Sequence, residues 1–434
     1  MRSFNAILKA RIIGEAGWVF LGQLGTALGS IVGLKLLTQL LPKEIYGRVN
    51  LLEVAMVLPG WLFFAPIMQA AIRLYAPSRE SKNLGPLFRT ILTLYFWVSL
   101  LVAAVGLTLI HTGLFKGTNF TPLALTLTLA ILLANTWQLL GTGISGAARL
   151  RRRAAGLSVF TTWSRPLCAG AFILLFAPSL GAVLTGYLVA SLAMLAPSLK
   201  PVRIAFHERN TPWVQKEILA KLLAYGAPYA IWSAFAWGEN YVDRYILQFL
   251  LGAATVGPYV AAFQVASMPF GFGAAFFLQL ATPIVFERAG AGTEPMRLAS
   301  GRAVVQSSVG LFAGLGILMI IGYALGGVWI MRLLTRADYV VSSGILTVLA
   351  VSAFAQSLAL LLGTSVLAHN RPDVLLWAYL IPGTLSVPLS FLWIRQAGML
   401  GAACANAATS FLFLALVWWI LRVVVDRPHA PAPR

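Results

Sequence analysis

Three charged residues interrupt an apolar run near the middle of the chain. Glu239 and Asp243 are four residues apart, so they share one face of a helix, whereas Arg244 is turned by about 100° from Asp243. Charged side chains are costly in apolar surroundings, and inside membrane proteins they mark paths for ions or polar ligands. A polar and aromatic stripe lies along the same run: Ser233, Trp237, Asn240 and Arg244. We expect this stripe to face a ligand cavity; alternatively, Asp243 and Arg244 form a structural pair near the outer end of the run.

Four more polar residues lie in apolar runs of the first half. Lys35 falls one position from the counterpart of Arg244 at an offset of 210 residues, so each half carries one cation at a similar depth. A lysine near a helix end can also reach the membrane interface alone. Glu53 shares a helix face with Asn50, and a carboxylate there could couple proton uptake to a conformational change or simply lie at the interface. Gln23 completes the cavity candidates.

Three arginines lie near expected helix ends. Arg73, Arg89 and Arg149 precede or follow apolar runs, and three consecutive arginines follow at 151–153. This group could receive an anion at the cytoplasmic mouth of a cavity. Alternatively, it only sets the orientation of the chain and contacts anionic lipids.

Metal, cofactor and enzyme signatures are missing from the sequence. The four histidines are isolated, and Cys168 and Cys404 lie in apolar runs without a second ligand nearby, so we expect no metal site and no disulfide. No nucleotide-binding loop, zinc-protease motif or nucleophile elbow is found. We therefore expect no cofactor, and a protein that is not an enzyme.

The composition is that of an integral membrane protein. Hydrophobic residues make up 59% of the 434 residues, charged residues only 10%, and the mean hydropathy is +0.83. A membrane-spanning helix needs about 20 mostly apolar residues. Twelve runs meet this length: 14–41, 45–70, 86–110, 120–147, 156–177, 180–199, 226–250, 255–284, 303–333, 341–367, 373–394 and 398–421. We predict an all-α fold with about twelve membrane-spanning helices.

Basic residues are distributed unevenly between the two sides of these runs. We assign 24 lysines and arginines, Arg165 among them, to one side and 6 to the other. Lysine and arginine are enriched in cytoplasmic loops, so both termini are predicted to be cytoplasmic. Because the same bias explains most of the net charge of +19, we expect no nucleic-acid partner.

Two phrases occur once in each half of the chain. LLGTGISGAAR at 139–149 matches LLGTSVLAHNR at 361–371, and LLTQLLPKEIYG at 36–47 matches ILQFLLGAATVG at 246–257. Each half holds six predicted spans, an even number, so matched helices run in the same direction. This arrangement predicts a parallel repeat of two six-helix lobes. The predicted divisions are an N-terminal lobe 1–200, a linker 201–225, a C-terminal lobe 226–425 and a disordered cytoplasmic tail 426–434.

The linker has the features of a short amphipathic helix. Thr211 suits the N-cap position and Pro212 the first helical position. Apolar residues then alternate with Lys216 and Lys221, as in helices that lie on a membrane surface.

The hairpin phrases resemble those of a known family. LLTQLLPKEIYGRVNLLE and ENYVDRYILQFLLGAATVGPYVAAFQVASMP are similar to the first hairpins of the two halves of polysaccharide transporters, the Wzx-type O-antigen flippases of the multidrug/oligosaccharidyl-lipid/polysaccharide (MOP) exporter superfamily. The resemblance implies two bundles around a central cavity that opens alternately to each side of the bacterial inner membrane. It also implies an undecaprenyl-pyrophosphate-linked oligosaccharide as cargo, with Arg244 contacting phosphate or sugar and an acid from a neighbouring helix holding it.

Two alternatives remain at this level. A cation-coupled exporter of drugs or small solutes has the same outline, but its cavity should be more apolar and aromatic, with one key carboxylate. A membrane-bound polymerase or ligase should carry a large outer loop, and no run between the spans is long enough for one. Partners expected from the resemblance are the lipid-linked substrate, membrane lipids and the polysaccharide polymerase with its chain-length machinery.

Overall fold

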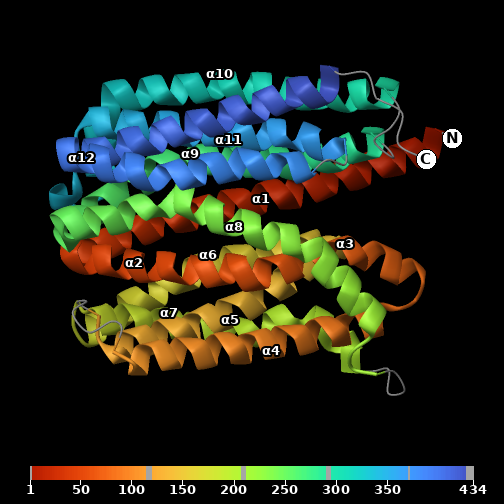
Figure 1. The fold of residues 1–434 in the computed structure, drawn as a ribbon, viewed down its shortest axis with the longest axis horizontal. Coiled ribbons are helices and arrows are strands. Elements are labelled where there is room, and N and C mark those ends of the chain that lie inside the picture. The colour runs from red at the N-terminus through yellow and green to blue at the C-terminus, as the bar shows by residue number, and fades with distance from the viewer. Residues whose placement is uncertain (1, 114–119, 207–211, 290–294, 370–371, 427–434) are drawn as a thin grey trace. The chain divides into compact units, whose positions relative to one another are not determined.

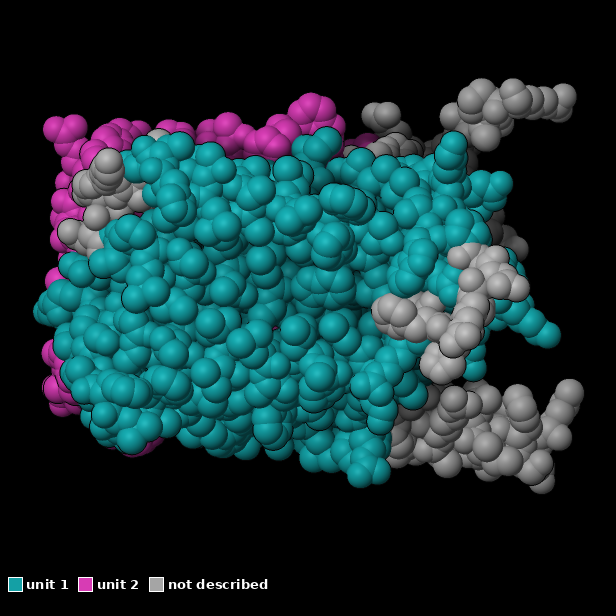
Figure 2. Space-filling model, turned by 90° about the horizontal axis from the view of Figure 1, so that it is seen from below, with its two compact units in different colours: residues 1–234 teal, residues 235–434 magenta. Residues whose placement is uncertain are grey.

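The protein folds into helices throughout the described part of the chain. A computed structural model describes residues 2–113, 120–206, 212–289, 295–369 and 372–426, and it contains no strand in these ranges. The chain divides into two compact units, residues 1–234 and 235–434, which are coloured separately in Figure 2.

The first unit begins with a helical hairpin and continues with four further membrane-length segments (Figure 1). A π-helical turn interrupts the second segment between Pro59 and Pro66, where the proline rings disturb regular α-helical hydrogen bonding. The elements are α1 (Arg2–Leu40), α2 (Lys43–Pro59), η1 (Gly60–Phe64), α3 (Ala65–Glu80), α4 (Leu84–His111), α5 (Pro122–Ala147), α6 (Arg151–Leu175), α7 (Leu180–Leu199) and η2 (Lys200–Phe206).

A glycine stripe joins α1 to α6. Gly25, Gly29 and Gly33 are spaced by four residues, and the stripe packs on the α6 side chains Trp163 and Pro166. A Cβ at Gly29 would lie 2.7 Å from the Trp163 ring, whose indole nitrogen donates to the Gly25 carbonyl over 2.9 Å. The small residues therefore serve close helix packing.

The second unit starts inside a long helix and holds five further segments. The elements are α8 (Lys216–Leu251), α9 (Ala253–Ala289), α10 (Pro295–Leu334), η3 (Ala337–Tyr339), α11 (Ser343–Ala368) and α12 (Pro372–Asp426). Gly398 breaks α12 into two helices, because its φ of 59° and ψ of −132° are not helical. A positive φ is natural for glycine and strained for other residues.

The predicted fold class is confirmed. Ten helices of the described residues are long and apolar enough to cross a membrane. That number counts the broken α12 once, and it leaves out α6, whose apolar part is interrupted by Arg165 and several serine and threonine residues. With these two taken into account, the helices correspond to the twelve predicted spans, and the chain is a multi-pass membrane protein.

Two expectations from the sequence are wrong. Arg165 was assigned to a cytoplasmic segment, but it lies in the middle of α6. The linker does not form a separate helix: Pro212 lies outside any helix, and α8 begins at Lys216 and continues without a break for 36 residues. The proposed N-cap Thr211 and the tail from 427 onward lie outside the described residues. The predicted lobe boundaries and central cavity stay predictions.

Candidate functional site

A polar pocket lies inside the first unit. It has a volume of about 420 Å³ and is enclosed by α2, η1, α3, α4, α5 and α6. Most of its lining is apolar, and we call it the polar pocket because it also carries two charged residues, an amide and two hydroxyl groups: Glu53, Met56, Val57, Gly60, Trp61, Phe64, Ala65, Met68, Tyr95, Leu132, Asn135, Thr136, Leu139 and Arg165. Pockets of this size and mixed lining commonly hold organic ligands.

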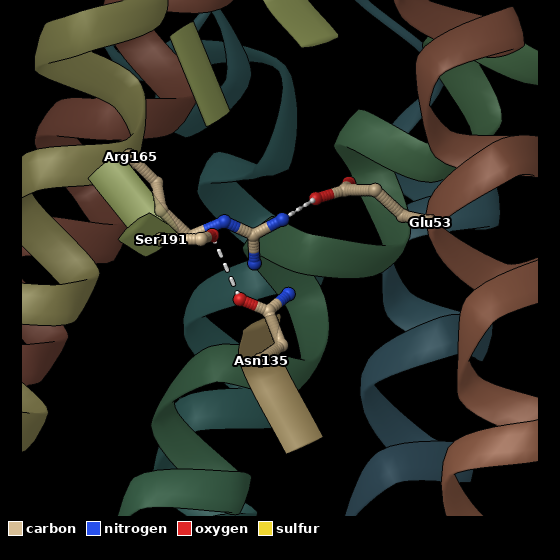
Figure 3. A network of polar contacts seen from close by, with 4 residues as sticks. All are labelled: Glu53, Asn135, Arg165 and Ser191. Carbon is tan, nitrogen blue, oxygen red and sulfur yellow. Dashed lines mark hydrogen bonds and ion pairs between the residues drawn. The ribbon is translucent and has the colours of Figure 1, made fainter. Parts of the chain in front are cut away.

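An ion pair lies at one side of this polar pocket. The Arg165 guanidinium donates to Glu53 Oε1 over 3.1 Å, and the two side chains remain 26% and 28% exposed (Figure 3). The guanidinium also lies over the ring of Tyr187 of α7, 4.5 Å from its centroid. The ring and the carboxylate together hold the arginine in place while leaving part of it accessible to a ligand.

Two amides and a serine link α5 to α7 next to the ion pair. Ser191 Oγ donates to Asn135 Oδ1 over 2.8 Å, and Gln138 Nε2 donates to the Ser191 carbonyl. Figure 3 shows the amide group of Asn135 on the side of Arg165 and Glu53. Because its oxygen is fixed by Ser191, its NH₂ group is oriented as a donor towards the polar pocket.

Aromatic rings form the opposite wall. The Tyr95 hydroxyl donates to the Phe64 carbonyl in the π-helical turn over 3.3 Å, and the two rings are 5.3 Å apart. This hydrogen bond ties α4 to the π-helical turn. The turn also presents Trp61 to the polar pocket.

The charged residues predicted on α8 form a closed cluster in the second unit. Glu239, Asp243 and Arg244 are all buried. Asp243 accepts hydrogen bonds from the Arg244 backbone over 2.8 Å and from the hydroxyl of Tyr259 of α9. The Arg244 guanidinium lies 4.9 Å from the ring centroids of both Tyr241 and Phe263. Aromatic rings therefore surround this cation.

Glu239 differs from its neighbours in the cluster. Neither of its carboxyl oxygens has a hydrogen-bond partner among the described residues, although both are buried. The expectation that an acid from a neighbouring helix holds Arg244 stays a prediction.

The other stripe residues of α8 bond to their own helix. Ser233 Oγ donates to the Tyr229 carbonyl over 2.7 Å, and Asn240 Nδ2 donates to the Ala236 carbonyl over 2.8 Å. The Trp237 ring lies 5.8 Å from the ring of Tyr245. Their predicted role in a cavity is not tested by these contacts and stays a prediction.

The first-unit candidates occupy different environments. Glu53 lines the polar pocket, whereas Asn50 is buried one turn before it, Gln23 is half-buried and Lys35 is exposed on α1. Lys35 and Arg244 belong to different units, so their shared anion site stays a prediction.

The three arginines predicted at a cytoplasmic mouth do not share one environment. Arg149 is exposed and has a φ of 57°, and Arg73 is exposed but lies within α3, two turns before its end. Arg89 is buried, and its guanidinium lies 5.5 Å from the ring centroid of Trp213.

The comparisons with known proteins identify the family. The family described as polysaccharide biosynthesis proteins matches residues 13–287. The chain belongs to this family. A search of curated protein sequences found no match.

Solved structures share the fold of this polysaccharide biosynthesis protein at low sequence identity. The lipid II flippase MurJ in an inward closed conformation has a TM-score of 0.70 at 13% identity, covering 94% of this chain and 87% of its own. An inward-facing multidrug resistance MATE transporter of the MOP superfamily has a TM-score of 0.68 at 12% identity, covering 96% and 94%. A MOP superfamily transporter from Pyrococcus furiosus has a TM-score of 0.65 at 14% identity, covering 96% of this chain and 95% of its own. The predicted MOP fold is thereby confirmed.

Sequence reasoning missed part of the polar pocket. The count of basic residues assigns Arg165 to the cytoplasmic side, although it lies within the run 156–177, which is itself predicted to span the membrane. Asn135 and Gln138 stand out as polar residues in the apolar run 120–147. A search for polar residues inside every predicted span would have found all three.

Proposed function

We propose that this protein flips a lipid-linked oligosaccharide across the bacterial cytoplasmic membrane, for O-antigen, capsule or exopolysaccharide synthesis. The family and the fold support a transporter for such material. In this proposal both termini are cytoplasmic, as the distribution of basic residues predicts. The polysaccharide polymerase and its chain-length machinery would receive the flipped product.

The observation that carries the proposal is the polar pocket with Arg165 at its side. The head group of an undecaprenyl-pyrophosphate-linked sugar carries negative charge and many hydroxyls, and neither dissolves in hydrocarbon. Arg165 offers a planar fork of donors that matches phosphate. The Asn135 amide and the Trp61 and Tyr95 rings suit sugar hydroxyls and sugar faces.

The ion pair does not prevent phosphate binding. Arg165 and Glu53 are both partly exposed, and partly exposed ion pairs contribute at most about 1 kcal/mol. A hydrogen bond from a charged donor to a doubly charged ligand contributes about 1.5–3 kcal/mol. In this proposal a phosphate displaces Glu53 from Arg165.

A cation-coupled exporter is the second candidate, and one observation favours it. The polar pocket contains a single carboxylate, Glu53, among aromatic and methionine side chains, which suits an organic cation. Arg165 is the residue that separates the two candidates, because a fixed cation repels a cationic drug.

Reconstituted vesicles provide the test. Purified protein is placed in liposomes with a fluorescent undecaprenyl-pyrophosphate oligosaccharide, and a membrane-impermeant quencher reports the fraction in each leaflet. Arg165→Ala should slow translocation about tenfold or more, since a charge-assisted phosphate contact is lost. Arg336→Ala is the matched control, because it removes an arginine from an exposed ion pair with Asp338.

The outcomes separate the candidates. Translocation by the unaltered protein, lost in Arg165→Ala and kept in Arg336→Ala, supports the flippase. No translocation above protein-free liposomes, combined with uptake of a cationic dye that Arg165→Ala accelerates, contradicts the flippase and supports the exporter.

A further inference from the structure

A second hollow lies in the first unit, apart from the polar pocket. It has a volume of about 570 Å³ and lies between α4, α5, α7 and η2. We call it the lateral groove. Its lining is apolar except for one threonine and one arginine: Leu92, Thr93, Phe96, Trp137, Ala196, Leu199, Val202, Arg203 and Trp213. None of these lining residues is acidic.

A wall separates the lateral groove from the polar pocket. Trp137 lines the groove, and its indole nitrogen donates to Ser99 Oγ over 3.1 Å. On the other side its ring packs edge-on against Tyr95, 5.5 Å away, which lines the polar pocket. Because Tyr95 is fully buried and bonded to Phe64, a molecule in the groove does not continue into the polar pocket.

One end of the lateral groove has the features of a membrane interface. Trp213 is 51% exposed there, and its ring is held by the buried Arg89 guanidinium. The backbone nitrogen of Gln215 donates to Thr90 Oγ1 over 3.2 Å, which ties this segment to the beginning of α4. Indole rings with such a polar neighbour settle at the level of lipid head groups.

A cation lies at the same end. Arg203 is an exposed residue of η2 and the one charged residue of the lining. Lys200 is exposed three residues before it in the same short 3₁₀-helix, hence on the same face. The other end of the lateral groove runs past Phe96, which is 56% exposed. The groove is therefore apolar, with basic residues at one end.

We propose that the lateral groove binds an anionic phospholipid, with one hydrocarbon chain along α4 and the phosphate at Arg203. Charge complementarity selects an anionic head group, since the rim is basic and no lining residue is acidic. The closed wall at Tyr95 and Trp137 argues against the chain of a transported lipid, whose head group would have to reach the polar pocket. The proposal does not depend on which cargo the protein carries.

Brominated lipids test this site directly, because bromine quenches a tryptophan that it touches. Protein is reconstituted in phosphatidylcholine vesicles containing either dibrominated phosphatidylglycerol or dibrominated phosphatidylcholine. The contribution of Trp213 to the fluorescence is the difference in tryptophan emission between the unaltered protein and Trp213→Phe. We expect phosphatidylglycerol to quench this contribution at severalfold lower mole fraction than phosphatidylcholine.

Variants assign the preference to the lateral groove. Arg203→Ala should reduce the preference about fivefold, as expected for one basic residue near a membrane surface. Arg79→Ala removes an exposed arginine from α3 of the same unit and should leave the preference for phosphatidylglycerol unchanged. Ala196→Phe adds a ring on an exposed lining position and should lower quenching by both lipids.

Three results would overturn the proposal. One is equal quenching by the two lipids in the unaltered protein. Another is an equal loss of preference in Arg79→Ala and Arg203→Ala, which would indicate general surface charge. The third is relief of quenching by undecaprenyl phosphate at concentrations where unbrominated phosphatidylglycerol has no effect, which would make the groove a carrier-lipid site.

Discussion

At the scale of single residues, the two units hold their intramembrane arginines in different ways. Arg165 has one carboxylate, one aromatic face and an accessible side next to the polar pocket. Arg244 lies between two aromatic rings and is buried. An accessible arginine can exchange partners at a small cost in free energy. A buried arginine must first lose its contacts with the residues packed around it. This difference makes Arg165 the better candidate for ligand binding in the described conformation.

Glu53 should therefore compete with an anionic ligand for Arg165. Glu53→Gln keeps the shape of the side chain and removes its charge, so we expect the KM for a pyrophosphate-linked sugar to fall by about fivefold, the equivalent of about 1 kcal/mol. Asp338→Asn is the control, since it removes the carboxylate of the exposed pair with Arg336. The measurement is the initial translocation rate against substrate density. A higher KM in Glu53→Gln would show that Glu53 contacts the ligand itself.

The sequence predicted Glu53 as a candidate but not the neighbours that define its role. A charged residue in an apolar run is visible in any sequence, which is why Glu53, Glu239 and Arg244 could be named. Asn135 and Ser191, which bond to each other beside the ion pair, come from α5 and α7. Their contact depends on how these helices pack. Spacing along one helix carries no information about such contacts.

At the scale of helices, glycine decides how closely the segments approach. A Cβ at Gly186 of α7 would lie 2.5 Å from the Ala169 Cα of α6, so the two backbones touch. The backbone cannot move aside as a flexible side chain can. This close approach places Tyr187 beside Arg165 and Ser191 beside Asn135.

Gly186→Ala should destabilise the first unit and weaken the polar pocket with it. We expect a loss of about 1–3 kcal/mol from overpacking, seen as a lower melting temperature in detergent. Gly156→Ala is the control, because nothing lies within 4 Å of a Cβ at that position of α6. It should be neutral or stabilising by about 0.5–1 kcal/mol. Equal melting temperatures for the two variants would mean that α6 and α7 are further apart than described.

Helix boundaries were predictable wherever composition changes sharply. The predicted span 341–367 corresponds to α11, and the gap after 394 corresponds to the break at Gly398. The beginning of α8 was not predictable, because Pro212 and the following lysines have the local features of a separate surface helix. Packing explains the outcome: Gly226 passes close to the Pro66 backbone, and the helix continues through that contact.

At the scale of the whole chain, the two units repeat one contact. In the first unit the Gly25 carbonyl of the first segment accepts from Trp163 of the fifth. In the second unit the Phe235 backbone of the first segment meets Gly383 of the fifth, where a Cβ would lie 2.4 Å from the Phe235 carbonyl. Gly25 and Phe235 are 210 residues apart, the offset of the repeated hairpin phrases, whereas Trp163 and Gly383 are 220 residues apart. The two contacts differ in kind, but both join the first segment of a unit to its fifth, as a parallel repeat predicts.

A parallel repeat with cytoplasmic termini fixes the direction of every segment, and the second segment tests it. The helical run Lys43–Glu80 is long enough to cross a membrane, so its two ends should lie on opposite sides. In a chain with Cys168 and Cys404 replaced by alanine, an impermeant maleimide added to intact cells should label Lys43→Cys and leave Arg79→Cys unlabelled until the membrane is opened. Labelling of Arg79→Cys in intact cells would reverse the orientation. The Arg203 end of the lateral groove would then face the outer leaflet, and the accumulation of basic residues on that side would need a different cause from positive-inside insertion.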